Sequence, residues 1–190
     1  MINRLKQKFK KGFTLIETLV AVLILVTAIA GPLTIASKGL QTALVAKDQT
    51  IAYYLAQDAV EYIRFARDTN RLAGNGWLVG AGGNSSTGLS NCYSGSGVPS
   101  CYLDSLNNSP PTPTSCGGPC PIMYYDPNNH YFTYNTNAPN VPTLFTRSVF
   151  INKGIGGNND EASLTVTVSW SDLPGITHTI TVREDLLNWQ

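Results

Sequence analysis

The four cysteines of this 190-residue chain are the side chains with the clearest chemical potential. They are Cys92, Cys101, Cys116 and Cys120, so eight and three residues separate the members of the two local pairs. Structural zinc sites are typically built on C-x2-C pairs, which this spacing does not supply. An even number of cysteines outside the cytoplasm indicates disulfides instead. No metal site is expected here.

Catalytic chemistry finds little support in the remaining residues. His130 and His178 are the only histidines, and we interpret both as structural or exposed rather than as bases or ligands. The serines stand in no nucleophile-elbow pattern. No G-x4-G-K-[S/T] sequence is present that would hold nucleotide phosphates. The chain is therefore predicted not to be an enzyme.

Two turns are rich in the oxygen ligands that Ca²⁺ prefers. One contains Asp126, Asn128 and Asn129, and the other covers residues 158–161. We expect solvated turns and no cofactor, with Ca²⁺ at one turn as the alternative. A nearby aromatic group could stack on a sugar or a base, although strand packing explains it more simply. Its members are Tyr124, Tyr125, Tyr131, Phe132 and Tyr134.

An apolar stretch near the N-terminus decides in which compartment these side chains lie. Residues 13–36 contain no cation and one acid, Glu17, and they follow five cations. At about 1.5 Å per residue, a helix over this stretch spans roughly 36 Å, enough to cross a hydrocarbon core of about 30 Å. The basic flank stays cytoplasmic under the positive-inside rule, so the chain beyond Ser37 is predicted to lie across the membrane. The five cations are Arg4, Lys6, Lys8, Lys10 and Lys11.

Glu17 is the unusual residue of this stretch. A carboxylate at membrane depth costs about 2.5–3.5 kcal/mol on insertion scales, so it indicates a function. Glu17 lies one turn beyond Phe13, where an interfacial position lowers that cost, and no cationic side chain lies at the same depth. Cleavage between Gly12 and Phe13 would create an α-amino group that supplies the missing positive charge.

Residues 12–17, Gly-Phe-Thr-Leu-Ile-Glu, resemble the processing site of type IV pilins and type II secretion pseudopilins. In that family a prepilin peptidase cuts after the glycine of a basic leader and methylates the new terminus. The retained apolar helix then packs into a filament core. The resemblance implies that Gly12 is the cleavage residue and Phe13 the methylated terminus. It also implies that Glu17 is the assembly acid, which pairs with the terminal amine of a neighbouring subunit.

An ordinary secretory signal peptide is the alternative interpretation of this region. Residues 28–30, Ala-Ile-Ala, followed by Gly31, form a small-residue cleavage site after a basic segment. Glu17 within the apolar run, and its continuation through Leu33 and Ile35, argue against it. A mature terminus at Gly31 instead of Phe13 would support it.

Four cysteines in an exported segment allow three disulfide pairings. We favour Cys92–Cys101 and Cys116–Cys120, because Gly-Gly-Pro between the second pair provides a tight turn and short loops close at low entropic cost. The nested pairing, Cys92–Cys120 with Cys101–Cys116, stays open as the alternative.

Residues 38–69 have the periodicity of an amphipathic helix, whose apolar stripe we expect to pack on a sheet of the same chain. Residues 69–70 and the glycines that follow predict its end. Gly31-Pro32 lies further upstream, and a kink or a locally melted turn is expected there. The stripe consists of Leu40, Leu44, Ile51, Leu55, Ala59, Ile63 and Ala66.

The C-terminal part alternates apolar and polar residues with period two. Residues 145–152, 164–170 and 176–182 show this pattern with Thr and Ser on the polar side, and residues 131–134 form a further short candidate. Such alternation predicts antiparallel strands covered on one face. The chain is therefore predicted to be α+β, with a long N-terminal helix packed on a C-terminal antiparallel sheet of three to four strands. The pilin resemblance implies the same architecture.

These patterns divide the chain into five parts. We expect a basic leader at 1–12 that is removed, a transmembrane and filament-core helix at 13–37, and an amphipathic helix at 38–70. A Cys-containing variable loop region follows at 71–142, and an antiparallel β-sheet at 143–190.

Net charge argues against nucleic acid as a partner. The full chain carries +1, and without the five leader cations eight cations stand against twelve acids, which gives the mature chain about −4. A basic patch large enough for nucleic-acid binding is therefore not indicated.

The predicted function is that of a non-enzymatic structural subunit, a minor pilin or pseudopilin of a type IV pilus or type II secretion-like filament. The resemblance implies prepilin peptidase, other pilin subunits and an inner-membrane assembly platform as partners. It also implies a single-pass inner-membrane precursor whose C-terminal domain lies outside the cytoplasm, and then a periplasmic or cell-surface filament. The alternative is a tip adhesion subunit whose Cys loop recognises a surface, a glycan or DNA.

Overall fold

The computed structural model describes residues 12–78, 88–93, 100–105, 113–154, 159–173 and 175–188. The chain forms two compact units, Met1–Ala46 and Lys47–Gln190. The basic leader other than Gly12 lies outside the described residues.

Helix α1 is a single element of 58 residues, Leu15–Leu72. It continues through Pro32, which corrects the expectation of a locally melted turn at Gly31-Pro32. Proline removes one backbone donor, and a long helix can absorb this loss where the other residues favour helix. The helix ends two residues later than predicted, at a left-handed Gly74 with φ +72°. Glycine adopts this conformation at helix C-termini without steric cost.

The sheet has seven strands rather than the predicted three or four. Three long strands come from the predicted sheet region, and the short candidate at 131–134 is confirmed as a strand at 131–133. The three additional strands, at 101–102, 114–115 and 122–126, lie within residues 71–142, the predicted loop region, and have two to five residues each, too few to show a clear period in the sequence. The strands are β1 Cys101–Tyr102, β2 Thr114–Ser115, β3 Ile122–Asp126, β4 Tyr131–Thr133, β5 Val141–Lys153, β6 Glu161–Leu173 and β7 Ile176–Leu187.

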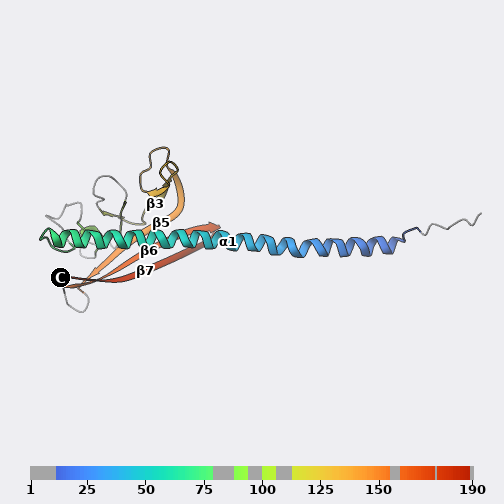
Figure 1. The fold of residues 1–190 in the computed structure, drawn as a ribbon, viewed down its shortest axis with the longest axis horizontal. Coiled ribbons are helices and arrows are strands. Elements are labelled where there is room, and N and C mark those ends of the chain that lie inside the picture. Colours follow the sequence, from blue (N-terminus) through green and yellow to red (C-terminus); the bar gives the residue numbers. More distant parts are fainter. Residues whose placement is uncertain are drawn as a thin grey trace, which may run out of the picture. The chain divides into compact units, whose positions relative to one another are not determined.

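Strand β5 is the centre of the sheet. Its one edge pairs with β6, which pairs in turn with β7, and all of these pairs are antiparallel. Its other edge is shared by β3 and by β1, with β4 beyond β3 and β2 beyond β1. Figure 1 shows β5, β6 and β7 side by side as long strands.

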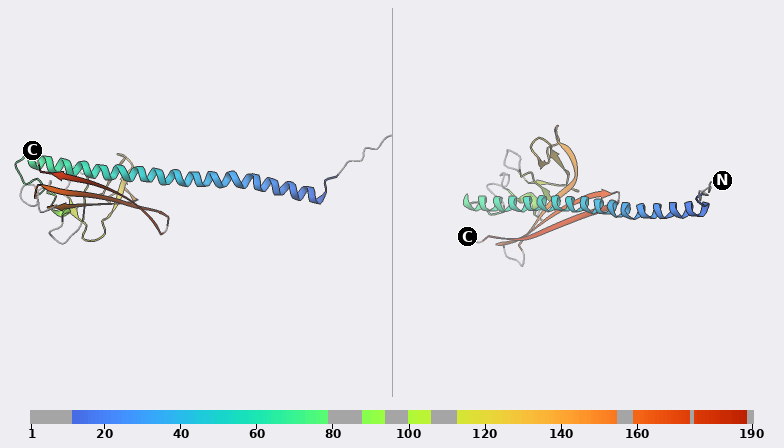
Figure 2. Two further views of the ribbon diagram at one scale, coloured as in Figure 1. Left: turned by 90° about the horizontal axis from the view of Figure 1, so that it is seen from below. Right: turned by 45° about the vertical axis from the view of Figure 1, so that its right-hand side comes forward.

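The core of the unit 47–190 lies between the second half of α1 and one face of the sheet. In Figure 2 the strands lie on one side of this part of the helix. The predicted alternation of β6 is confirmed, because its apolar residues are buried and the intervening Thr and Ser are half-buried. Buried core residues include Leu55, Ala59, Ile63, Ala66, Val149, Ile151, Leu164, Val166, Val168 and Trp170.

The helix stripe needs one correction. Leu40 and Leu44 share the helical face of the buried residues, yet their side chains are 64% and 52% exposed. The first buried residue of α1 is Ala52. Helical periodicity identifies a face, but it does not show where along the helix the covering sheet begins.

One buried charge joins the layers of this unit. Arg147 on β5 is 1% exposed, and its Nη1 donates to the carbonyl of Leu55 at 2.8 Å and to Asp58 Oδ2 at 2.7 Å. Its Nη2 donates to the carbonyl of Leu103 at 2.7 Å, and Ser105 Oγ donates to the same Asp58 oxygen at 2.8 Å. The guanidinium therefore connects α1, β5 and the segment after β1.

Candidate processing and assembly site

Gly12, Phe13 and Thr14 precede the helix and are exposed. A Cβ built on Gly12 meets no atom within 4 Å, and the Phe13 side chain is 78% exposed. The peptide bond between Gly12 and Phe13 therefore lies in non-helical, accessible backbone. Packing within the described part of the chain does not require a glycine at this position.

Thr14 caps the first turn of α1. Its hydroxyl accepts a hydrogen bond from the backbone N–H of Glu17 at 3.3 Å, and its carbonyl accepts from the N–H of Thr18 at 3.2 Å. Glu17 thus stands at the third helical position, as in the Thr-x-x-Glu capping box. A carboxylate in the first turn is stabilised by the partial positive charge of the helix N-terminus. Thr14 was not singled out in the sequence, although the Thr-x-x-Glu pattern was visible there.

The helix that follows exposes an apolar surface. Its long apolar side chains between Leu15 and Ile35 are 45–82% exposed. By length and composition, α1 could cross a membrane. The most hydrophobic 18-residue window has a mean hydropathy of 2.5, and none of it is buried. Such a surface requires lipid or other apolar helices around it.

Five hydroxyl groups in the first half of this helix form hydrogen bonds to its own backbone. The hydroxyl groups of Thr18, Thr27, Thr34, Ser37 and Thr42 each donate to a carbonyl three or four residues earlier, at 2.8–3.0 Å. Back-bonding of this kind removes the cost of a hydroxyl in an apolar medium. Glu17 is the one ionisable side chain between residues 13 and 37. It makes no ion pair within the described part of the chain.

The cysteines form the two local disulfides, Cys92–Cys101 and Cys116–Cys120. Both sulfurs of the first pair are buried, so we call it the buried disulfide, and the second pair is the half-buried disulfide. Cys101 pairs with Val149 of β5, and Tyr93, next to Cys92, bridges to Ile151. The buried disulfide therefore holds two segments on the same edge of β5.

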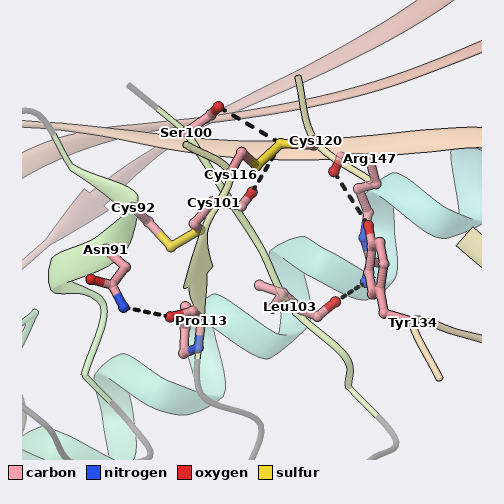
Figure 3. Close-up of a disulfide and its surroundings, with 10 residues drawn as sticks. All are labelled: Asn91, Cys92, Ser100, Cys101, Leu103, Pro113, Cys116, Cys120, Tyr134 and Arg147. Atoms are coloured by element: carbon pink, nitrogen blue, oxygen red, sulfur yellow. Dashed lines mark hydrogen bonds between the residues drawn. A yellow bond between two sulfur atoms is a disulfide. The ribbon is translucent and has the colours of Figure 1, made fainter. Parts of the chain in front are cut away.

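The two disulfides lie close together in Figure 3. Cys120 Sγ lies 3.9 Å from the carbonyl oxygen of Cys101 and 3.7 Å from Ser100 Oγ. The N–H of Cys116 donates to the carbonyl of Ser100 at 3.0 Å. The figure also shows Tyr134 donating to the carbonyl of Arg147 at 3.3 Å. Burial raises the pKa of this tyrosine hydroxyl.

A groove of about 300 Å³ lies on the unit 47–190. Aromatic rings and aliphatic side chains form most of its wall, together with the Asp58 carboxylate and the Ser105 hydroxyl. Pockets of this size, apolar with a few polar groups, are typical of small-ligand sites. The lining residues are Ile51, Tyr54, Leu55, Asp58, Ser105, Tyr131 and Phe132.

The oxygen-rich turn after β3 is hydrogen-bonded internally. Asp126 accepts from the side-chain amide of Asn129 at 2.9 Å and from the N–H groups of Asn128 and Asn129 at 2.8 and 3.2 Å. These bonds, the Asn129 amide first, lower the pKa of the Asp126 carboxyl. Among the described residues no three His, Cys, Asp or Glu side chains form a metal-binding group. The absence of a cofactor stays a prediction.

The remaining candidates are separated from one another. Asn158 of the second turn lies outside the described residues, while Asp160 accepts from the Asn188 amide at 2.8 Å. His130 lies in the turn after β3, with Nδ1 2.9 Å from the Tyr125 hydroxyl. His178 stacks on Trp170 with ring centroids 5.3 Å apart. The two histidines thus contact aromatic residues in separate parts of the unit 47–190.

Comparison with known proteins gives one finding, and it concerns the N-terminal segment. No curated protein and no solved structure matches the chain. Residues 7–31 match the family described as the prokaryotic N-terminal methylation motif. The matched segment includes the accessible Gly12-Phe13 bond, the Thr14 cap and Glu17. The chain therefore carries the prokaryotic N-terminal methylation motif, the signature of type IV pilins and pseudopilins.

Proposed function

We propose that this protein is a non-enzymatic structural subunit of a type IV pilus or a type II secretion-like filament. It is made as a precursor anchored in the inner membrane by residues 13–37. Prepilin peptidase cleaves it after Gly12 and methylates Phe13. Other pilin subunits and an inner-membrane platform then take it into a periplasmic or cell-surface filament.

The observation that carries this proposal is the chemistry of the helix start. The Gly12-Phe13 bond lies in exposed backbone immediately before a capped helix. Residues 13–37 are apolar, and the hydroxyls of Thr18, Thr27, Thr34 and Ser37 bond within the helix, so Glu17 is the one ionisable side chain of this segment.

After cleavage, each subunit carries two charges that lack a partner, the new α-amino group and the Glu17 carboxylate. The new α-amino group lies at the positive end of the helix dipole, where a cation is disfavoured. A carboxylate in an apolar surrounding is also disfavoured unless it is paired. In a bundle of such helices, Glu17 of one copy and the Phe13 amine of another neutralise each other.

We further propose that the protein is a minor rather than a major subunit of the filament. The cysteine-containing region 88–120 supplies two short strands and two disulfides, which suits a specialised head. The position of Gly31-Pro32, two residues nearer the mature start than in the major pilins that the motif resembles, points the same way.

The test follows processing and incorporation separately. Gly12→Leu is expected to block cleavage and to leave a precursor larger by the leader, seen by intact mass. Glu17→Ala and Glu17→Gln are expected to be cleaved and methylated normally but to be lost from sheared filaments. Thr27→Val is the matched control, because its hydroxyl bonds only within its own helix.

Two outcomes would contradict the proposal. A mature terminus at Gly31 would show a signal peptide in place of a processed pilin. Normal incorporation of Glu17→Gln would show that the carboxylate is not paired during assembly.

A second candidate function is binding at a filament tip, and the groove beside Tyr54 favours it. Its rings can stack on the C–H face of a sugar, while Asp58 and Ser105 supply hydrogen-bonding groups. A deletion of residues 80–121 would remove β1 and β2 as well as both disulfides. Point substitutions in the groove are therefore the better test.

Tyr54→Ala and Tyr53→Ala form a matched pair for this purpose. The two residues are neighbours on α1 and are 65% and 54% exposed, but Tyr54 lines the groove. Loss of cell attachment to a glycan-coated surface with Tyr54→Ala alone would support the binding function. Equal attachment by both variants, with filaments intact, would remove the groove from consideration.

A further inference from the structure

Asp58 and Ser105 in the groove beside Tyr54 can accept hydrogen bonds but have no proton to donate to a ligand. Ser105 Oγ donates to Asp58 Oδ2 at 2.8 Å, so the serine offers a ligand only the lone pairs of its oxygen. Asp58 Oδ2 also accepts from Arg147 Nη1 at 2.7 Å, whereas Asp58 Oδ1 makes no hydrogen bond within the described part of the chain. The guanidinium itself is 1% exposed and is not part of the groove wall. A ligand therefore has to bring the donors to these two side chains.

The charges around this groove are negative in sum. Asp104 directly precedes the serine of the wall, and Asp126 on β3 is the register partner of Tyr131, so both carboxylates belong to neighbours of wall residues. With Asp58 they set three carboxylates against the guanidinium of Arg147, which gives a sum of −2 over these four side chains. Such surroundings attract a cation and repel an anion.

Three aromatic rings share the wall with these acceptors. The ring of Tyr54 is 65% exposed, and those of Tyr131 and Phe132 are half-buried. An aromatic face attracts a cation that lies within about 6 Å of its centre, and it also packs against the apolar C–H face of a sugar ring. A ligand that combines an ammonium group with a sugar ring uses both properties.

We propose that the groove binds an amino sugar. The protonated amine donates to Asp58 Oδ1, and the sugar ring packs against Tyr54 and its aromatic neighbours on the wall. A charge-assisted hydrogen bond of this kind is stronger than one from a neutral hydroxyl. An N-acetylated sugar lacks the charge, and an acidic sugar is repelled by Asp58. Binding of this ligand rests on the second candidate function, a ligand site at the groove, and is independent of assembly through residues 13–37.

Matched trisaccharides test the ligand class on the full chain in detergent. The probes are β-1,4-linked trimers of glucosamine, N-acetylglucosamine and glucose, and a tri-lysine peptide with blocked ends, which carries three ammonium groups without a sugar ring. In titration calorimetry at pH 6, the glucosamine trimer is expected to bind about tenfold more tightly than any other probe. Equal affinity for the N-acetylglucosamine trimer would show that the charge is not recognised, and equal affinity for tri-lysine would show that the sugar is not. Either result, or no binding of the glucosamine trimer, would overturn the proposal.

Asp58→Asn separates the charge at the groove from the overall charge of the protein. The amide oxygen of asparagine can still accept from Arg147 and Ser105, so the variant loses the carboxylate but keeps an acceptor for both. Its preference for the glucosamine trimer over the N-acetylglucosamine trimer should fall from about tenfold to about one. Asp48→Asn, on the same helix but outside the groove wall, is the matched control and should keep the preference. Equal loss in both variants would indicate unspecific attraction of a polycation and would contradict the proposal.

A second pair of variants keeps the test independent of the Asp58–Arg147 ion pair. Tyr54→Ala should weaken binding of the glucosamine trimer about tenfold, because it removes the most exposed ring of the wall. Tyr53→Ala should leave binding unchanged, and unchanged binding by Tyr54→Ala as well would count against the amino-sugar site. Filament incorporation of all these variants is expected to be normal, so a failure at the groove leaves the structural function of the protein standing.

Discussion

Replacing Arg147 by methionine should be among the most destabilising single substitutions in the unit 47–190. The methylene groups of the new side chain fill most of the space, so the change removes the charge and its donors more than the packing. Two carbonyl oxygens, of Leu55 and Leu103, and one Asp58 oxygen lose donors at 2.7–2.8 Å.

Burial sets the magnitude. Arg147 is 1% exposed, and its removal leaves the carbonyls of Leu55 and Leu103 without donors, at a cost of about 1–3 kcal/mol for each buried group. For a chain of this size, each kcal/mol lowers Tm by about 2–4 °C, so the expected decrease is about 10 °C or more.

Arg64→Met provides the matched comparison. Arg64 contacts Glu184 at 2.7 Å and Glu61 at 2.8 Å, but its side chain is 43% exposed. Its removal should cost about 1 kcal/mol or less, because solvent screens surface ion pairs. Thermal unfolding of the full chain in detergent, followed by tryptophan fluorescence, measures both variants. If Arg147→Met destabilised the protein no more than Arg64→Met, the burial argument would be refuted.

Two further predictions concern the unit 47–190. The Asn129 hydrogen bond and its neighbours hold the pKa of Asp126 below its ordinary value, so they contribute stability above about pH 4 that is lost as the pH falls through the folded pKa. Urea midpoints of wild type and Asp126→Asn should therefore differ at pH 6 and converge near pH 2.5; a constant difference would contradict this linkage. Replacing both cysteines of the buried disulfide by serine should cost about 2–4 kcal/mol in urea unfolding, and more than the same change at the half-buried disulfide. The shorter loop of the latter and its weaker packing give the order, which equal costs would contradict.

Much of the fold was accessible from the sequence because its long elements have strong periods. Residues 164–170 alternate over seven positions, and the structure buries the apolar set of β6 as that pattern predicts. Of the short strands, β4 was predicted at 131–134, whereas β1, β2 and β3 could not be predicted from the sequence. β1 and β2 have two residues each, and their pairing follows from contacts with β5 and from the disulfides rather than from local propensity.

The functional and structural side chains likewise include some that the sequence predicts and some that it does not. Gly12, Phe13 and Glu17 follow from a contiguous motif with a basic flank, which sequence alone can show. The contacts of Arg147 join residues that are 44 to 92 positions apart, and no local pattern indicates them. The alternation of residues 145–152 predicts that Arg147 lies on the inner face of β5, but it does not identify the hydrogen-bond partners that stabilise a buried charge there.

The hydroxyl groups of α1 that bond to its own backbone affect the cost of moving this helix from lipid into a bundle of helices. Thr18, Thr27, Thr34 and Ser37 keep their hydrogen bonds whether lipid tails or apolar helices surround them. Transfer of this helix between a bilayer and a helical bundle then breaks no hydrogen bond of these groups, and the apolar side chains find similar surroundings in both. Under the proposed function, the free-energy difference between the two states would depend largely on Glu17 and the Phe13 amine of another copy. The helix would then enter a filament and return to the membrane at a small energetic cost in either direction.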